Sequence, residues 1–181
     1  MKKNRFTTDN FQNTLLTIAI EDYFQCVQLT DGTIIKLHLI DTAGQEKFNS
    51  IVKNYYQKAD CCLLIYDITN KESFEKIQNY YIPLIKENKN IRKIVLLGNK
   101  ADLENQRNVS KEEGSQLAEK NEYVFMESSC KENINVSDAF TTLVEMTNTE
   151  LKKKFIKSDT FKLRKSKKSV NNPQKKKKCC D

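Results

Sequence analysis

Apolar and polar residues alternate in the first part of the chain, and this pattern predicts a pair of strands. Within residues 33–40, two leucines alternate with a lysine and a histidine, as in a strand with one buried face. Residues 18–29 have the composition of a second strand, and Thr30-Asp31-Gly32 supplies the positive φ angles of a tight hairpin turn. We therefore expect an antiparallel hairpin, preceded by a loop over residues 7–17.

A different pattern begins at residue 61, where short apolar runs alternate with segments of helical periodicity. Continuous apolar runs are typical of strands that are covered on both faces. We expect such strands at residues 61–66, 94–97 and 123–126, and helices at residues 46–58, 71–88, 111–120 and from about 136. This order predicts an α/β fold in three layers: a mostly parallel sheet with one antiparallel edge strand and helices on both faces.

Two helices carry further local signals. Pro83 lies inside the helix at 71–88 and is expected to kink or shorten it. Ser110 and Glu113 have the spacing of a capping box that opens the next helix. The apolar face expected for the helix at 71–88 consists of Phe74, Ile77, Tyr80, Tyr81, Leu84 and Ile85.

Charge divides the chain into two regions. The 181 residues carry a net charge of +7, but residues 151–181 hold 13 basic and 2 acidic side chains, so the rest of the chain is mildly acidic. We expect one folded domain over residues 1–156 and a disordered basic tail over residues 157–181. A tail of this charge is expected to bind an anionic partner, either a membrane surface or a nucleic acid. No apolar run approaches a membrane span, and the cysteine spacing favours a reducing compartment.

Three short motifs each follow a predicted strand. Asp41 follows the strand at 33–40, and Gly44 and Gln45 come directly after it in the segment Asp-Thr-Ala-Gly-Gln-Glu. Open α/β sheets place their ligands at the carboxyl ends of their strands. The second motif, Asn99-Lys100-Ala101-Asp102, ends in a carboxylate that can accept two hydrogen bonds from the N1–H and N2–H₂ edge of guanine, a pair that adenine does not offer. A solvated loop is the alternative interpretation of this motif alone.

The third motif is Glu127-Ser128-Ser129-Cys130-Lys131, and together the three resemble those of small GTPases of the Ras superfamily. Asp41 to Gln45 is similar to the D-x-x-G-Q motif, residues 99–102 to N-K-x-D, and residues 127–131 to the E-T-S-A-K loop, with Cys130 where alanine is usual. The resemblance is strongest to the Rab family, on the evidence of Tyr55-Tyr56, Ile68-Thr69 and the terminal cysteine pair.

The resemblance implies a GTP/GDP-binding site with Mg²⁺ and a GTP hydrolase activity. Thr17 and Asp41 would hold Mg²⁺, the Gly44 amide would contact the γ-phosphate, and Gln45 would orient the attacking water. The base would be bound by Asn99, Lys100, Asp102, Ser129, Cys130 and Lys131. Two simpler interpretations remain open: Thr17 merely opens a strand, and Gln45 is a solvated loop residue.

One piece of the family pattern does not occur in the sequence. A phosphate-binding loop, G-x-x-x-x-G-K-[ST], precedes the switch segment in such proteins, whereas the first glycine here is Gly32. Losing four charged hydrogen bonds at ~1.5–3 kcal/mol each would weaken nucleotide binding ~10⁴-fold or more. The family resemblance implies the small G-domain of a P-loop NTPase, with its first strand missing. That strand would lie between the strands at 33–40 and 61–66, so its absence leaves two strand edges unpaired. We expect an incomplete chain, with an evolved pseudo-GTPase as the alternative.

The C-terminus carries the last signal. Cys179 and Cys180 follow a run of four lysines and resemble the double-cysteine ends that Rab proteins use for geranylgeranylation. Two lipid chains with basic residues suffice for stable anchoring, whereas a solvated tail or a nuclear targeting signal is the simpler interpretation of the lysines.

Two residues depart from the Rab pattern, one in a region that binds partners and one in the switch segment. Ile40 stands where a tryptophan is common in Rab proteins, and Ala19 replaces a usual glycine.

Three functional hypotheses follow. The first is a Rab-like switch in vesicle traffic on the cytoplasmic face of intracellular membranes, cycling with the cytosol. Its exchange factors, GTPase-activating proteins and effectors would bind through residues 17–56. The second is a nucleotide-free binding module that docks partners on a membrane. The third, a nucleic-acid binder, is disfavoured because no aromatic residues interleave with the basic residues at 162–178.

Overall fold

A computed structural model of the chain describes residues 21–41, 57–87 and 90–166, with only the backbone from residue 153 onward. The chain divides into two units, Met1–Thr147 and Asn148–Asp181. The features below belong to the first unit unless stated otherwise.

Three parallel strands form the central sheet, in the order β3 (Cys61–Asp67), β4 (Lys93–Asn99) and β5 (Val124–Ser128). The strand β4 lies in the middle, and its apolar residues from 94 to 97 are all buried. The sequence predicted all three strands, and the structure extends each of them toward its carboxyl end. Asp67, Asn99 and Ser128 therefore belong to the strands instead of to the loops that follow.

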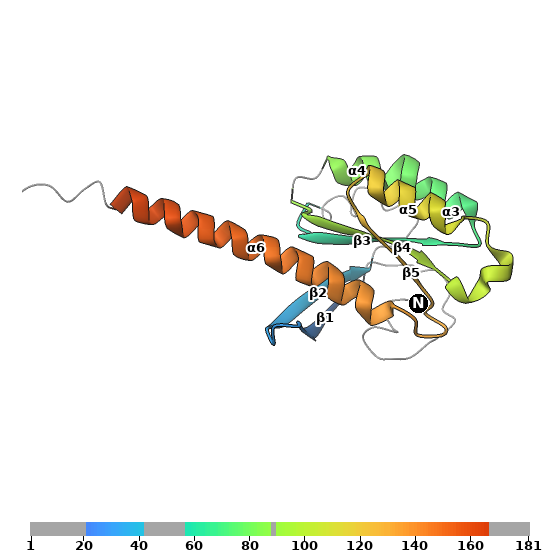
Figure 1. Ribbon diagram of the computed structural model, residues 1–181, viewed down its shortest axis with the longest axis horizontal. Coiled ribbons are helices and arrows are strands. Elements are labelled where there is room, and N and C mark those ends of the chain that lie inside the picture. The colour runs from blue at the N-terminus through green and yellow to red at the C-terminus, as the bar shows by residue number, and fades with distance from the viewer. Residues whose placement is uncertain (1–20, 42–56, 88–89, 167–181) are drawn as a thin grey trace, which may run out of the picture. The chain divides into compact units, whose positions relative to one another are not determined.

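Helices cover both faces of this sheet, as predicted (Figure 1). On one face lie α3 (Lys71–Lys76), α4 (Ile82–Lys86) and α5 (Lys111–Lys120), which pack with the strand residues Leu64, Tyr66 and Leu96. Against the other face lies the start of α6 (Val136–Ser166), where Val136 and Phe140 pack near Leu63. Ser110 closes both halves of the predicted capping box of α5.

The helix predicted over residues 71–88 is interrupted by a π-helical segment, Ile77–Tyr81. The wider turn lets the Ile82 amide bond to the Ile77 carbonyl five residues earlier, so Ile77 and Ile82 are both buried. The predicted face is confirmed at Phe74, Ile77 and Ile85, which are buried, and Tyr81 packs against the same core as a half-buried residue. The prediction missed Ile82, which is buried. Pro83 sits in the first turn of α4, where its missing N–H costs little.

The predicted hairpin is present as β1 (Glu21–Gln28) and β2 (Ile34–Asp41), paired antiparallel from Glu21–Asp41 to Gln28–Ile34. Its inner face packs on α6, with Val27 and Leu29 in one cluster with Val144. Within the described residues, β1–β2 and β3–β4–β5 are two separate sheets. The gap between them lies at β2 and β3, the two edges that the family resemblance leaves without the first strand. Leu39 of β2 and Leu63 of β3 nevertheless pack against the same cluster, Cys130, Val136 and Phe140.

Helix α6 continues past the predicted start of the tail. The sequence predicted disorder from residue 157, but residues 157–166 are helical. This stretch contains no glycine or proline before Pro173, and its lysines, arginine and leucine are good helix formers. Residues 167–181 lie outside the described residues, as does most of the helix expected at 46–58.

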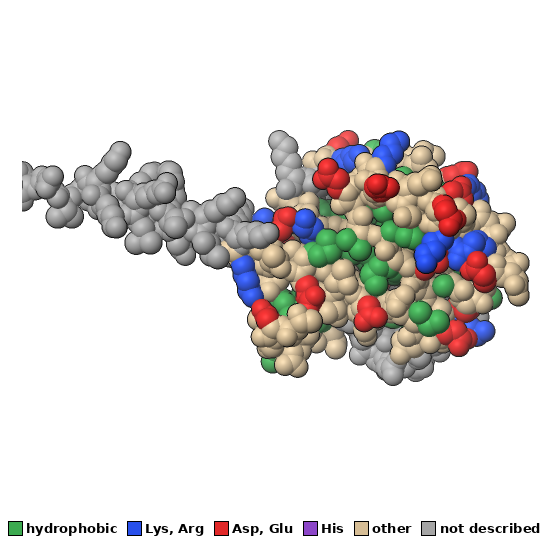
Figure 2. All heavy atoms as spheres, in the orientation of Figure 1, with side chains coloured by type: hydrophobic (Ala, Val, Ile, Leu, Met, Phe, Trp, Pro, Cys, Tyr) green, Lys and Arg blue, Asp and Glu red, His purple; other side chains and the backbone are tan. Residues whose placement is uncertain are grey.

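The described surface of the first unit has mixed charge. Figure 2 shows acidic and basic side chains interspersed on the face in view, with small apolar patches between them. Within the described residues, no helix has the length and apolar character to cross a membrane.

Candidate guanine-base site

The register of the parallel sheet brings three polar residues into one row at its carboxyl edge. Asp67 ends β3 and pairs with Asn99, which ends β4 and pairs in turn with Ser128 at the end of β5. Asn99 and Ser128 are buried, and the Ser128 hydroxyl donates a hydrogen bond to Asn99 Oδ1 at 3.2 Å. Ligands of open α/β sheets bind at this edge, so the row marks the candidate site.

Lys100, the residue after β4, is held by the end of β3. Its backbone is left-handed, with φ 67°, which is unfavourable for a side chain of this kind. Its Nζ lies 2.5 Å from Asp67 Oδ2, and Thr69 donates to Asp67 Oδ1 from both its amide (2.9 Å) and its hydroxyl (2.8 Å). Burial pushes the pKa of Asp67 upward, but the hydrogen bonds from Lys100 and Thr69 outweigh it and hold the pKa below its ordinary value. Asp67 is therefore ionised at neutral pH.

Asp102 is the residue that suits a guanine base. It lies in the 3₁₀ segment Ala101–Gln106 and is half-buried. The hydroxyl of Ser129 donates to its Oδ1 at 2.5 Å, and the Ser129 oxygen accepts from the Glu132 amide at 3.0 Å. A carboxylate accepts several hydrogen bonds, so one anchored by Ser129 retains the acceptor capacity that the N1–H and N2–H₂ edge of guanine requires. The donor and acceptor chemistry of these residues fits that base.

The side chains of Cys130 and Lys131 do not join this polar cluster. Cys130 is 2% exposed and packs with Val136 and Phe140, so its thiol belongs to the core. Lys131 is exposed, and its Nζ lies 3.8 Å from Glu132 Oε1, a kind of surface pair that contributes little. The predicted base contact through the backbone of this loop stays a prediction.

Comparison with known proteins assigns the chain to a family. A family model described as "Ras family" matches residues 3–149. The chain is 38% identical over 179 residues to GTP-binding protein ypt2 of Schizosaccharomyces pombe, covering 97% of this chain and 86% of that protein. It is 45% identical to Ras-related protein Rab-13 of Bos taurus (77% of this chain, 68% of that protein) and 44% identical to Rab-8A of the same species (83% and 72%).

The chain belongs to the Rab family of small GTPases. Rab proteins in general bind guanine nucleotide and Mg²⁺, together with exchange factors, GTPase-activating proteins and effectors. The structure brings the Asn99–Asp102 and Glu127–Lys131 loops together through the Asn99–Ser128 and Asp102–Ser129 hydrogen bonds, and their binding of guanine stays a prediction.

The phosphate side of this Rab-family chain is only partly described. Thr17, Gly44 and Gln45 lie outside the described residues, as do Cys179 and Cys180. Asp41 is described as the half-buried last residue of β2. Among the described residues, no group of three or more His, Cys, Asp or Glu side chains is placed to hold a metal ion. The Mg²⁺ ligands and the water-orienting glutamine stay predictions.

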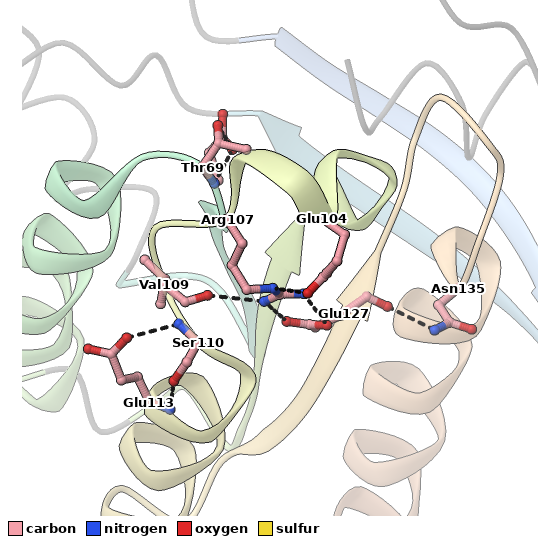
Figure 3. Close-up of polar contacts among 9 residues, drawn as sticks. Thr69, Glu104, Arg107, Val109, Ser110, Glu113, Glu127 and Asn135 are labelled. Carbon is pink, nitrogen blue, oxygen red and sulfur yellow. Dashed lines mark hydrogen bonds and ion pairs between the residues drawn. The ribbon is translucent and has the colours of Figure 1, made fainter.

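The sequence did not single out three residues that surround the base loops. Arg107, Glu127 and Asn135 form a polar cluster beside the site (Figure 3). Glu127 was noted only as part of its motif, and Arg107 and Asn135 lie in loops that gave no signal of their own. Asp67 had one signal, its position directly after a buried apolar run, but the sequence alone did not indicate its pairing with Lys100.

Proposed function

We propose that this Rab-family chain is a GTP/GDP switch in vesicle-mediated transport, held on the cytoplasmic face of intracellular membranes by prenylation of Cys179 and Cys180. One observation carries the nucleotide part of the proposal. Two side-chain hydrogen bonds join this edge of the sheet: Ser128 at the end of β5 bonds to Asn99 at the end of β4, and Ser129 bonds to Asp102. This arrangement preorganises an anionic acceptor at the sheet edge where such folds bind nucleotide.

The remaining roles rest on the family resemblance. Thr17 and Asp41 would hold Mg²⁺, which supplies charge neutralisation at the phosphates when bound. Gln45 would orient the water that attacks the γ-phosphate, and the Gly44 amide would contact that phosphate. Residues 17–56 would change conformation with the bound nucleotide and so select exchange factors, GTPase-activating proteins and effectors.

A change of base specificity tests the nucleotide proposal. In an Asp102→Asn variant, the side-chain amide would accept from N1–H and donate to the 2-oxo group of xanthine, but it would meet the 2-amino group of guanine with a second donor. Two charged hydrogen bonds at ~1.5–3 kcal/mol each predict a shift in the GDP-to-XDP affinity ratio of about 10²-fold or more. The matched control is Asp138→Asn, the same exchange on an exposed residue of the first turn of α6. An unchanged ratio in the Asp102 variant contradicts the proposal.

A second candidate function is a nucleotide-free binding module, because the 181 residues contain no G-x-x-x-x-G-K-[ST] sequence. Chromatography of nucleotide released from the purified chain separates the two. Guanine nucleotide in stoichiometric amount supports the switch, and its absence supports the module.

The membrane part of the proposal has its own test. Replacing Cys179 and Cys180 by serine removes both lipid attachment points but keeps the lysine run, whose members contribute ~1 kcal/mol each near an anionic leaflet. Stable anchoring needs two signals, and without the lipids only the lysines remain. The variant should therefore move from the membrane fraction to the cytosol on cell fractionation, whereas the single Cys26→Ser control should not. Unchanged membrane or nuclear localisation of the double variant would instead support binding through the basic tail alone.

A further inference from the structure

We propose that Arg107 is a positioning residue for guanine recognition: its guanidinium locks Glu127, and through it the two serines that hold Asn99 and Asp102. The inference rests on the proposed function, because it assigns a residue that sets the specificity of the same site. Arg107 binds Glu127 and Glu104 and acts on Asp102 through these partners.

Every N–H of the Arg107 guanidinium has an acceptor (Figure 3). Nη1 and Nη2 donate to the two carboxylate oxygens of Glu127 at 2.7 and 3.1 Å. Nε and Nη2 donate to the two oxygens of Glu104 at 2.8 and 2.6 Å, and Nη1 also donates to the Val109 carbonyl at 3.0 Å. Such a doubly bidentate arrangement fixes the orientation of both carboxylates, and a lysine ammonium cannot reproduce it.

The cluster joins the loop after β4 to the end of β5. Glu104 belongs to the same 3₁₀ segment as Asp102, whereas Glu127 is the residue before Ser128. The side chains of Arg107 and Glu127 are only 15% and 14% exposed. A buried, hydrogen-bonded ion pair of this kind resists displacement more than a surface pair does. Glu127 is also fixed through its backbone, because Asn135 Nδ2 donates to its carbonyl at 2.8 Å.

Three consecutive residues at the end of β5 and just after it thus contact the end of β4 and the segment that follows β4. Glu127 binds Arg107, Ser128 donates to Asn99, and Ser129 donates to Asp102. Because backbone bond lengths and angles are fixed, holding Glu127 limits the positions available to the next two residues. The ion pair therefore controls where Ser129 places the Asp102 carboxylate.

The expected consequence is specific to the 2-amino group of the base. Hypoxanthine keeps the N1–H of guanine but lacks that amino group, so the GDP-to-IDP affinity ratio measures the contact that a precisely placed carboxylate adds. One charged hydrogen bond corresponds to about tenfold or more in affinity. An Arg107→Lys variant should lose most of this factor by binding GDP more weakly while IDP binding changes less. General destabilisation would weaken both nucleotides alike.

The experiment compares the full 181-residue chain with Arg107→Lys and Asn135→Gly, measuring GDP and IDP affinities by titration. Asn135 has φ 54°, so glycine keeps the backbone while removing the amide that holds Glu127, and this variant serves if Arg107→Lys does not fold. Lys71→Gln is the matched control, because it breaks another ion pair, Lys71–Glu113, that lies between α3 and α5. A lowered ratio in both test variants and an unchanged ratio in the control are expected.

Hydrogen exchange gives a second readout that requires no nucleotide. The amides of Ser129 and Ile134 bond to each other's carbonyls, at 3.1 and 2.9 Å, and so report on the order of the loop. Their exchange should accelerate in Arg107→Lys but not in Lys71→Gln. Unchanged exchange, or an equal loss for GDP and IDP, overturns the inference alone. Absence of any guanine preference in the unsubstituted chain overturns the proposed function, and with it the role in recognition.

Discussion

The hydroxyl of Tyr66 is a buried polar group. Tyr66 is 1% exposed, and within the described part of the chain its oxygen has no hydrogen bond. Burial, followed by the nearby Glu127 carboxylate, raises its pKa, so the group stays protonated. Leaving a buried hydroxyl unsatisfied costs about 1–3 kcal/mol.

We therefore expect Tyr66→Phe to be neutral or to raise the free energy of unfolding by about 1 kcal/mol, since the ring and its edge contact with Phe74 remain. Urea unfolding followed by circular dichroism measures the difference. A loss of stability above about 1 kcal/mol would show that the hydroxyl has a partner, such as a buried water.

Asp67 should make the stability of the folded chain depend on pH in the acid range. In the folded protein, the pKa of Asp67 is lowered below its ordinary value of 3.8. Its interactions with Lys100 and Thr69 therefore stabilise the fold fully above pH 3.8. This stabilisation is lost as the pH falls through the folded pKa. The difference in melting temperature between the unsubstituted chain and Asp67→Asn should be constant from pH 7 to about pH 4 and shrink below it. A difference that already declines between pH 7 and 5 contradicts this assignment.

At the residue scale, the sequence predicted the groups whose chemistry is local and missed those that depend on tertiary contacts. Asp102 was singled out because a carboxylate after a buried strand can accept two hydrogen bonds from guanine, and that role stays a prediction. Arg107 was missed because its partner Glu127 is 20 residues away in sequence and no spacing rule connects the two. The role of Cys130 in base binding stays a prediction, and the burial of its side chain follows from packing with Val136 and Phe140 of α6.

Among the elements, α5 offers the clearest local prediction. Ser110 accepts from the Glu113 amide at 3.1 Å, and Glu113 accepts from the Ser110 amide at 2.9 Å. Ser110→Ala removes the first bond and should lower the free energy of unfolding by about 1 kcal/mol, measured by chemical denaturation. Ser115→Ala, at an exposed position within the same helix, should have no such effect. Equal behaviour of the two variants would exclude a role for the cap.

The interrupted helix shows where prediction of elements reaches its limit. A period of 3.6 residues identified the helical region at 71–88 but assumed a uniform α-helix. The π-helical turn shifts every later side chain, so that Ile82 is buried and Tyr81 is displaced to the margin of the core. The proline at 83 explains why the turn widens here, since its ring disfavours the preceding α-helical turn, but the sequence does not distinguish this outcome from a kink.

At the scale of the whole molecule, the described strands form two sheets, with no pairing between β2 and β3. The hairpin β1–β2 pairs only with itself in the described residues, and it packs through apolar side chains on α6. The parallel sheet holds its own core with α3 to α5. The sequence predicted both groups of strands correctly, because each is set by local patterns, but pairing between distant strands depends on what lies between them.

This division predicts unequal local stability. Among the described strands, β4 alone has a hydrogen-bonded neighbour on each side, and Val95 and Leu96 are fully buried. The hydrogen bonds of the β4 amides should therefore break only on global unfolding. Those between β1 and β2 should break when the two strands of the hairpin separate, because a two-stranded hairpin is marginally stable by itself. In native-state hydrogen exchange, we expect Val95 and Leu96 to exchange more slowly than Gln25 and Leu37, a facing pair of the hairpin, by at least about a hundredfold. Equal protection would mean that the hairpin and the parallel sheet unfold as one cooperative body, through a strand that pairs with both β2 and β3.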